Sequence, residues 1–201
     1  MDVDLLSLHG LGVKKAGGIE EIAKIMGLTS NQVESAFKTA QAEGLIVGAR
    51  GNFMLTPSGH QHLNESYAVV FKDLRENEAL NKSYERFEVI NKRLLALFTA
   101  WQSVTKAGTS VPNDHSDFEY DNRIFDDLGG IHERSQPIIA AFSKEVPRFA
   151  LYEERLSDAY DKVLSGQSEY VSGVRIDSYH TIWFELHEDL LRLLGRTREE
   201  N

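Results

Sequence analysis

The sequence predicts a mainly α-helical protein in two parts, a small helical module with a β-hairpin (residues 1–66) and an antiparallel helical bundle (residues 67–201). Three observations predict this division. In the first part, two short helical patterns are joined by a tight turn. They are followed by two apolar triplets on either side of a glycine-containing turn. In the second part, apolar residues recur at helical spacing along four long segments. A chain of 201 residues with 41% hydrophobic residues is long enough to bury a core in each part.

The first helical pattern ends in a turn, and the second begins with a capping box. Gly27 and Leu28 interrupt the first pattern, and Thr29 follows with Gln32 three residues later. At that spacing the threonine oxygen accepts a backbone hydrogen bond while the glutamine reaches back to the threonine backbone. The second helix is expected to end near Gly44, in a left-handed conformation. The apolar positions are Ile19, Ile22, Ala23 and Met26 in the first helix, and Val33, Ala36, Phe37 and Ala40 in the second.

A short hairpin and a further helix complete the first part. The β-prone triplets 45–47 and 53–55 flank the turn GARGN. Thr56 and Pro57 suit the N-cap and the first position of the next helix. Helix, helix-turn-helix, hairpin and helix is the order of a winged helix-turn-helix, with the hairpin as the wing. The stretch EGLIVGARGNFMLTPSGHQHL resembles the wing of MarR-type bacterial regulators, and this resemblance implies a DNA-binding regulator.

A winged helix that binds DNA inserts the N-terminal end of its second motif helix into the major groove. Asn31 and Gln32 carry paired donor and acceptor atoms that suit adenine, while Lys38 and Arg50 at the hairpin tip suit phosphates. The expected DNA-binding residues are Ser30, Asn31, Gln32, Ser35, Lys38, Thr39 and Arg50.

The charge of the chain opposes this interpretation. Its net charge is −9, and the first 66 residues carry seven acidic and five basic side chains. Glu34 and Glu43 lie on the same helix as the expected DNA contacts, where they would repel phosphate. A protein-docking role for the module, with the polar side chains simply solvated, therefore stays open.

The second part is expected to be helical throughout. Gly129-Gly130 and Pro137 are expected to split or kink its second helix, and KAGTSVPND before that helix is expected to be a loop. Residues 67–80 are expected to continue or link the preceding helix. The four apolar stripes run from Phe87 to Val104, from Phe118 to Phe142, from Phe149 to Val163 and from Ile176 to Leu193.

Aromatic and histidine side chains on the bundle helices suggest a ligand pocket. A bundle core that holds aromatic rings and a few polar groups is where small ligands bind, although each ring taken singly is more often core. The expected ligand-binding residues are Trp101, His132, Tyr179, His180, Trp183 and His187.

The same histidines raise the alternative of a metal ion. His180 and His187 lie seven residues apart, which is about 10 Å along a helix axis. Zinc–nitrogen bonds are only about 2 Å long, so one ion would need His132 or His115 from another helix. We therefore expect hydrogen bonding within the bundle and no metal site.

Several classes of function are disfavoured by the sequence. The absence of cysteine excludes disulfides and thiolate chemistry. No phosphate loop and no catalytic set is recognisable, so we expect neither a cofactor nor an enzyme. No stretch approaches the roughly 20 apolar residues of a membrane helix, and the acidic start lacks a signal-peptide pattern, so a cytoplasmic protein is expected.

The bundle also carries a resemblance. The runs YERFEVINKRLLALFTAWQ and YHTIWFELHEDLLRLLGR resemble a region that accompanies pyruvate phosphate dikinase-like domains in actinobacterial proteins. This implies an accessory module, because the catalytic domains of such enzymes are absent. Two functions follow: a transcriptional regulator on DNA whose bundle senses an effector or forms a homodimer, and an interaction module for an enzyme partner. A metal-dependent enzyme is a third alternative, which would need an ion bound near the histidines.

Overall fold

The protein is described by a computed structural model covering residues 1–106 and 108–198, which is mainly helical and divides into two compact units. Unit 1 comprises Met1–Asn77 together with the chain from Glu185 onward, and unit 2 comprises Glu78–Phe184. The expected boundary at residue 66 falls inside helix α4 (Pro57–Val70). The end of helix α9 (Tyr179–Leu194), which was expected in the bundle, belongs to unit 1.

Unit 1 begins with three helices, α1 (Val3–Lys14), α2 (Ile19–Met26) and α3 (Ser30–Ala42). Gly27 ends α2 with a φ of 68°, in the left-handed region that glycine adopts without strain. Thr29 caps α3, and the capping box with Gln32 is formed as predicted. Gly44 has a φ of 72° just beyond α3, which confirms the expected helix stop. The apolar positions expected on α3 are all buried.

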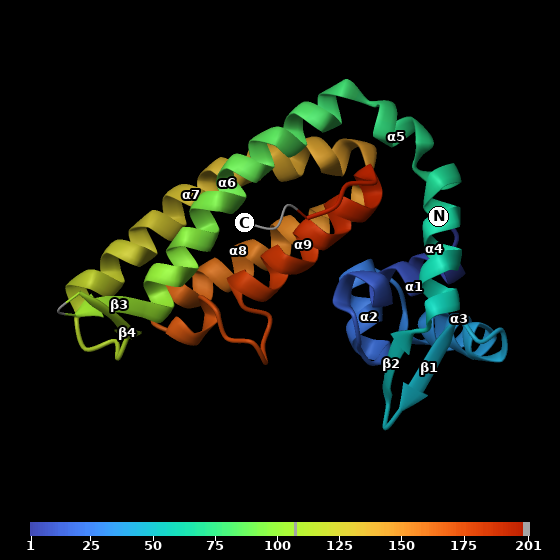
Figure 1. Ribbon diagram of the computed structural model, residues 1–201, viewed down its shortest axis with the longest axis horizontal. Helices are drawn as coiled ribbons and strands as arrows, with labels where there is room; N and C mark the ends of the chain where they lie inside the picture. Colours follow the sequence, from blue (N-terminus) through green and yellow to red (C-terminus); the bar gives the residue numbers. More distant parts are fainter. Residues whose placement is uncertain (107, 199–201) are drawn as a thin grey trace. The chain divides into compact units, whose positions relative to one another are not determined.

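An antiparallel hairpin follows these helices and projects from them (Figure 1). Strands β1 (Ile46–Ala49) and β2 (Asn52–Leu55) are joined by a two-residue turn of Arg50 and Gly51, both with positive φ. Two positive φ values are what a type I′ turn requires, and this turn matches the twist of the strands. Gly17, between α1 and α2, pairs with Phe53 through two backbone hydrogen bonds of 3.0 and 3.1 Å. This bridge ties the hairpin to the helices.

Helix α4 starts against the base of the hairpin. Thr56 is its N-cap and Pro57 occupies its first turn, as predicted. The Thr56 hydroxyl also donates to the carbonyl of Gly44. Gly59 lies so close to the Leu45 carbonyl that a Cβ there would meet the oxygen at 2.0 Å. Helix α5 (Lys72–Glu76) follows, and the first segment of unit 1 ends at Asn77.

Unit 2 is a helical bundle. Helices α6 (Glu78–Gln102), α7 (Phe118–Glu145) and α8 (Ala150–Leu164) pack in sequence, α6 on α7 and α7 on α8, and successive helices run in opposite directions (Figure 1). Two short 3-10 turns, η1 (Pro147–Phe149) and η2 (Ser168–Tyr170), connect the later helices. The start of α9 contributes Tyr179, Ile182 and Trp183 to the buried residues of this unit.

Two features of the bundle differ from expectation: the segment before α7 is a hairpin, and α7 is not split at its glycine pair or at Pro137. The segment expected as a loop forms a second hairpin, β3 (Ser103–Lys106) with β4 (Thr109–Pro112), although Ala107 lies outside the described residues. Val104, expected on the first helical stripe, pairs with Val111 in that hairpin. Helix α7 is continuous from 118 to 145 despite Pro137 and the glycine pair, because α6 and α8 both pack along it. No helix within the described ranges is long and apolar enough to cross a membrane.

Candidate nucleic-acid interface

The seven residues expected to contact DNA are all exposed. Six lie on α3, from its first residue Ser30 to Thr39, and Arg50 lies at the tip of the hairpin. Burial of Val33, Ala36, Phe37 and Ala40 directs the opposite face of α3 to solvent. The local sequence of α3 therefore presents a polar face that can be approached by a partner.

Gln32 has a structural role within this set. Its Oε1 accepts from the backbone N–H of Thr29 at 2.9 Å and from the Thr29 hydroxyl at 3.0 Å. A glutamine that reads adenine must use both its oxygen and its nitrogen. The capping box withdraws the oxygen, so Asn31 is the better candidate for a base contact at the start of α3.

Arg50 stands out because it is a non-glycine residue with a φ of 53°. Asparagine and glycine are the usual residues at this turn position, because a Cβ in left-handed backbone costs about 1–2 kcal/mol. The exposed guanidinium is thus held at the hairpin tip on a strained backbone. Such strain is often found at functional positions.

Acidic and apolar groups are exposed on the same elements. Glu34 is exposed on α3, one turn before Lys38, and Glu43, the C-cap residue of α3, is exposed as well. Val47 and Met54 are cross-strand partners on the hairpin and are 53% and 49% exposed. The surface therefore combines the polar side chains expected to contact DNA with two carboxylates and an apolar cross-strand pair.

The residues expected to bind a ligand are placed in both units. His187 belongs to unit 1, and the other five belong to unit 2. Trp101 packs against His115, with ring centroids 4.1 Å apart, and His180 meets Phe98 edge-on at 4.6 Å. Trp183 stacks on Phe87 and donates its Nε1–H to Asn91 at 3.0 Å. Trp101 and Trp183 are buried in these contacts, whereas His180 is half-buried and His115 is exposed.

Two members of the set, His132 and Tyr179, are joined to each other by a hydrogen bond. The Tyr179 hydroxyl lies 3.3 Å from His132 Nδ1, and Tyr160 stacks on the His132 ring at 5.0 Å. Burial raises the pKa of Tyr179, and burial lowers the pKa of His132 against the opposing field of Asp161 and neighbouring acids. Both groups are therefore neutral near pH 7. A ligand pocket at these residues stays a prediction.

A buried polar chain in unit 1 was missed by the sequence analysis. His9 on α1 contacts the Tyr67 hydroxyl through Nδ1 at 2.7 Å and Asp189 through Nε2 at 2.9 Å. His9 and Asp189 are 0% exposed and Tyr67 is 2% exposed. These buried hydrogen bonds join α1, α4 and the end of α9. The only signal for it was a histidine within an apolar helix.

No cluster of three or more potential metal ligands occurs in residues 1–106 and 108–198. The chain has no match among protein-family models, curated proteins or solved structures. The resemblances of the hairpin and of the bundle runs to known families therefore stay predictions.

Proposed function

We propose that the protein is a transcriptional regulator that binds DNA through unit 1, acting as a winged helix. Helices α2 and α3 serve as the helix-turn-helix, β1–β2 as the wing, and the Gly17–Phe53 bridge as the short third strand of that fold. The observation that carries the proposal is the exposed polar start of α3 together with an exposed arginine on the wing tip.

Each contact has a defined role in this proposal. Asn31 presents its amide to a base edge in the major groove, because the N-terminal residues of a recognition helix reach furthest into it. Ser30, Ser35, Lys38 and Thr39 contact the sugar-phosphate backbone, and Arg50 contacts phosphates beside the groove. The two carboxylates on α3 keep nonspecific affinity low, so recognition depends on the few base contacts.

The direct test is DNA retardation with a pool of genomic fragments at low salt, followed by fluorescence anisotropy on the fragment selected. Asn31→Ala is expected to weaken binding about tenfold, in line with about 1–3 kcal/mol for a good base contact. Gln41→Ala is the matched control, because Gln41 is an exposed amide near the other end of α3. A wild-type chain that retards no fragment contradicts the proposal.

The wing is tested by the salt dependence of the same equilibrium. Arg50→Ala is expected to reduce the slope of log K against log salt by about one, the loss of a single phosphate contact. Arg134→Ala removes another exposed arginine, on α7, and should leave the slope unchanged. Equal slopes for wild type and Arg50→Ala would exclude Arg50 from the interface.

A protein-interaction module is the second candidate, favoured by one observation. Val47 and Met54 form an exposed apolar pair on the wing, where a phosphate-facing surface would be polar. In that case Val47→Ser with Met54→Ser removes binding to an enzyme partner and leaves the fold intact. If the wild-type chain retards DNA fragments and the double substitution leaves its DNA affinity unchanged, the result favours the regulator over the interaction module.

A further inference from the structure

The ring of Phe53 connects the wing to helix α3 within unit 1. Phe53 lies on β2, three residues after Arg50 at the wing tip. Its ring packs against the ring of Phe37 on α3, with centroids 4.8 Å apart and planes inclined at 54°. Phe37 is only 1% exposed and belongs to the buried face of α3. Two aromatic rings at this distance stabilise each other beyond their burial, so this contact attaches the wing to α3.

Gly48 provides the space that this ring occupies. It is the cross-strand partner of Phe53, and a Cβ at Gly48 would meet two carbons of the Phe53 ring at 2.7 Å. Gly48 is not among the glycines with a positive φ, so its backbone does not require glycine. Glycine weakens a strand, because it has no side chain to pack and loses more backbone entropy than other residues. The missing side chain at Gly48 therefore serves the ring beside it.

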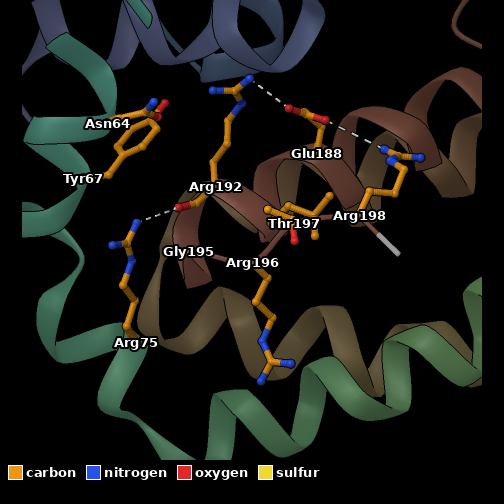
Figure 2. A pocket seen from close by; sticks show the side chains of 10 residues that line it. Asn64, Tyr67, Arg75, Glu188, Arg192, Gly195, Arg196, Thr197 and Arg198 are labelled. Atoms are coloured by element: carbon orange, nitrogen blue, oxygen red, sulfur yellow. Dashed lines mark hydrogen bonds and ion pairs between the residues drawn. The ribbon is translucent and has the colours of Figure 1, made fainter. Parts of the chain in front are cut away.

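The backbone of Phe53 is held by a third segment of unit 1. Its N–H and C=O pair with Gly17, just after α1. Lys15, two residues before Gly17, has a φ of 73° and donates through Nζ to Glu188 at 2.6 Å. Glu188 also pairs with Arg192 at 2.8 Å, beside a surface cavity of about 470 Å³ (Figure 2). The segment that pairs with Phe53 is thus itself anchored to the end of α9.

The position of the wing tip depends on the orientation of the hairpin at Phe53. Arg50 lies about 10 Å further along the hairpin, at about 3.4 Å per residue. A rotation of the hairpin by about 10° at Phe53 would therefore move the tip by about 2 Å. A hydrogen bond from arginine to phosphate is about 2.7–2.9 Å long, so a displacement of that size would break it.

We propose that Phe53 is a positioning residue for DNA binding, because it sets the place of the wing tip relative to the start of α3. This inference rests on the proposed function and names what brings two of its contacts to DNA together. With the Phe53 ring against Gly48 and Phe37, the wing keeps one orientation. Asn31 then reaches a base edge while Arg50 reaches a phosphate in the same complex. A rigid surface of this kind reduces the entropy cost of binding.

The first test measures DNA affinity and its salt dependence in two altered backgrounds. Gly48→Ala keeps Phe53 but forces its ring aside, and Phe53→Leu keeps an apolar side chain but removes the ring. Arg50→Ala is expected to lower the slope of log K against log salt by about one in wild type and by much less in either background. Asn31→Ala is expected to weaken binding about tenfold in all three, because α3 itself is unchanged.

This pattern distinguishes positioning from a purely structural role. If Arg50→Ala has the same effect on the slope in wild type and in both backgrounds, the proposal is overturned. If the effects of Arg50→Ala and Asn31→Ala are lost together in both backgrounds, the ring only stabilises unit 1, and the proposal is overturned as well. Met54→Leu is the matched control, because Met54 follows Phe53 on β2, points to the opposite face and is exposed. It should leave both effects as they are in wild type.

The second test needs no DNA. Backbone N–H residual dipolar couplings of the full chain report the orientation of the wing, residues 46–55, relative to α3, residues 30–42. Gly48→Ala and Phe53→Leu are expected to change the couplings of the wing and to keep those of α3, whereas Met54→Leu changes neither. Unchanged wing couplings in both variants would overturn the positioning role. A wild-type chain that binds no DNA would instead contradict the proposed function, and the couplings would still decide whether Phe53 orients the wing.

Discussion

The backbone angle of Arg50 lowers stability, and this cost indicates a functional role for the residue. Its φ of 53° places an L-residue where glycine or asparagine is preferred. The side chain is exposed, and neither a hydrogen bond nor an ion pair from it is found within residues 1–106 and 108–198 that would offset the strain. The strain is therefore a cost to folding that a contact with a partner would justify.

Replacing Arg50 by glycine is expected to stabilise unit 1 while it weakens DNA binding. Relief of left-handed strain contributes about 1 kcal/mol, partly offset by the greater entropy of glycine in the unfolded chain. Arg50→Asn should stabilise similarly, whereas Arg50→Ala keeps the strain and should not. Urea unfolding of the three variants measures this order. A glycine variant that is less stable than the alanine variant would contradict the strain argument.

At the scale of elements, local spacing predicted well and long-range pairing did not. The Thr29–Gln32 capping box, the Gly44 stop and the Thr56–Pro57 helix start were confirmed because each depends on residues within a few positions. The β3–β4 hairpin was missed because its four-residue strands contain polar and breaker residues beside two valines. The pairing of the two strands is recognised only in the structure, where Val104 lies opposite Val111.

The two glycines of α7 illustrate the same limit. They were expected to split or kink the helix, and they do not split it, since both lie inside α7. A Cβ at Gly129 would meet the Tyr160 hydroxyl at 2.4 Å, while a Cβ at Gly130 meets nothing within 4 Å. Gly129 therefore leaves room on α7 for the end of the Tyr160 side chain of α8, a reason that periodicity cannot reveal.

This difference gives a matched pair of substitutions in one helix. Gly130→Ala is expected to stabilise unit 2 by about 0.5–1 kcal/mol through helix propensity. Gly129→Ala gains the same propensity but displaces Tyr160 from its stack on His132, at about 1–3 kcal/mol for overpacking. Thermal unfolding should therefore rank Gly130→Ala above wild type and Gly129→Ala below it. The opposite order would mean that the Tyr160 side chain does not restrict the space beside Gly129.

His180 on α9 provides a test of pH dependence within unit 2. Burial lowers the pKa of His180 below its ordinary value of 6.5, and its Nδ1 has no hydrogen-bond partner in the described part of the chain. The unfolded chain then binds more protons than the folded chain below pH 6.5. The contribution of this neutral ring to stability is complete above pH 6.5 and is lost as the pH falls through the lowered folded-state pKa.

His180→Leu is expected to remove that contribution to acid sensitivity. Wild type should lose more thermal stability than the variant between pH 7 and pH 5, while the two should differ little in slope above pH 7. The leucine can keep packing against Phe98 and introduces no unsatisfied nitrogen. Parallel stability curves from pH 7 to pH 5 would show that His180 titrates as it does in the unfolded chain.

At the scale of the whole molecule, the two compact units do not follow the order of the chain. Unit 1 takes up residues from both ends, because His9 meets Asp189 and Lys14 meets Glu185 across more than 170 positions. Nothing in local composition marks Glu185 as a boundary, since α9 is continuous through it. From the sequence alone, the two parts of the chain could be divided only at residue 66, where the pattern of the hairpin module ends.

The arrangement predicts that residues 1–77 alone form an unstable fragment. Without the end of α9, His9 loses Asp189, Lys14 loses Glu185 and Arg75 loses its two carbonyl acceptors. Joining residues 185–198 to residue 77 by a flexible linker should restore these contacts and raise the free energy of unfolding by at least about 3 kcal/mol, the cost of breaking a buried pair. Asp189→Ala in the linked fragment distinguishes the contribution of the buried His9–Asp189 pair to stability from that of apolar packing. Equal unfolding midpoints for fragments 1–77 with and without the added segment would show that the end of α9 contributes nothing to unit 1.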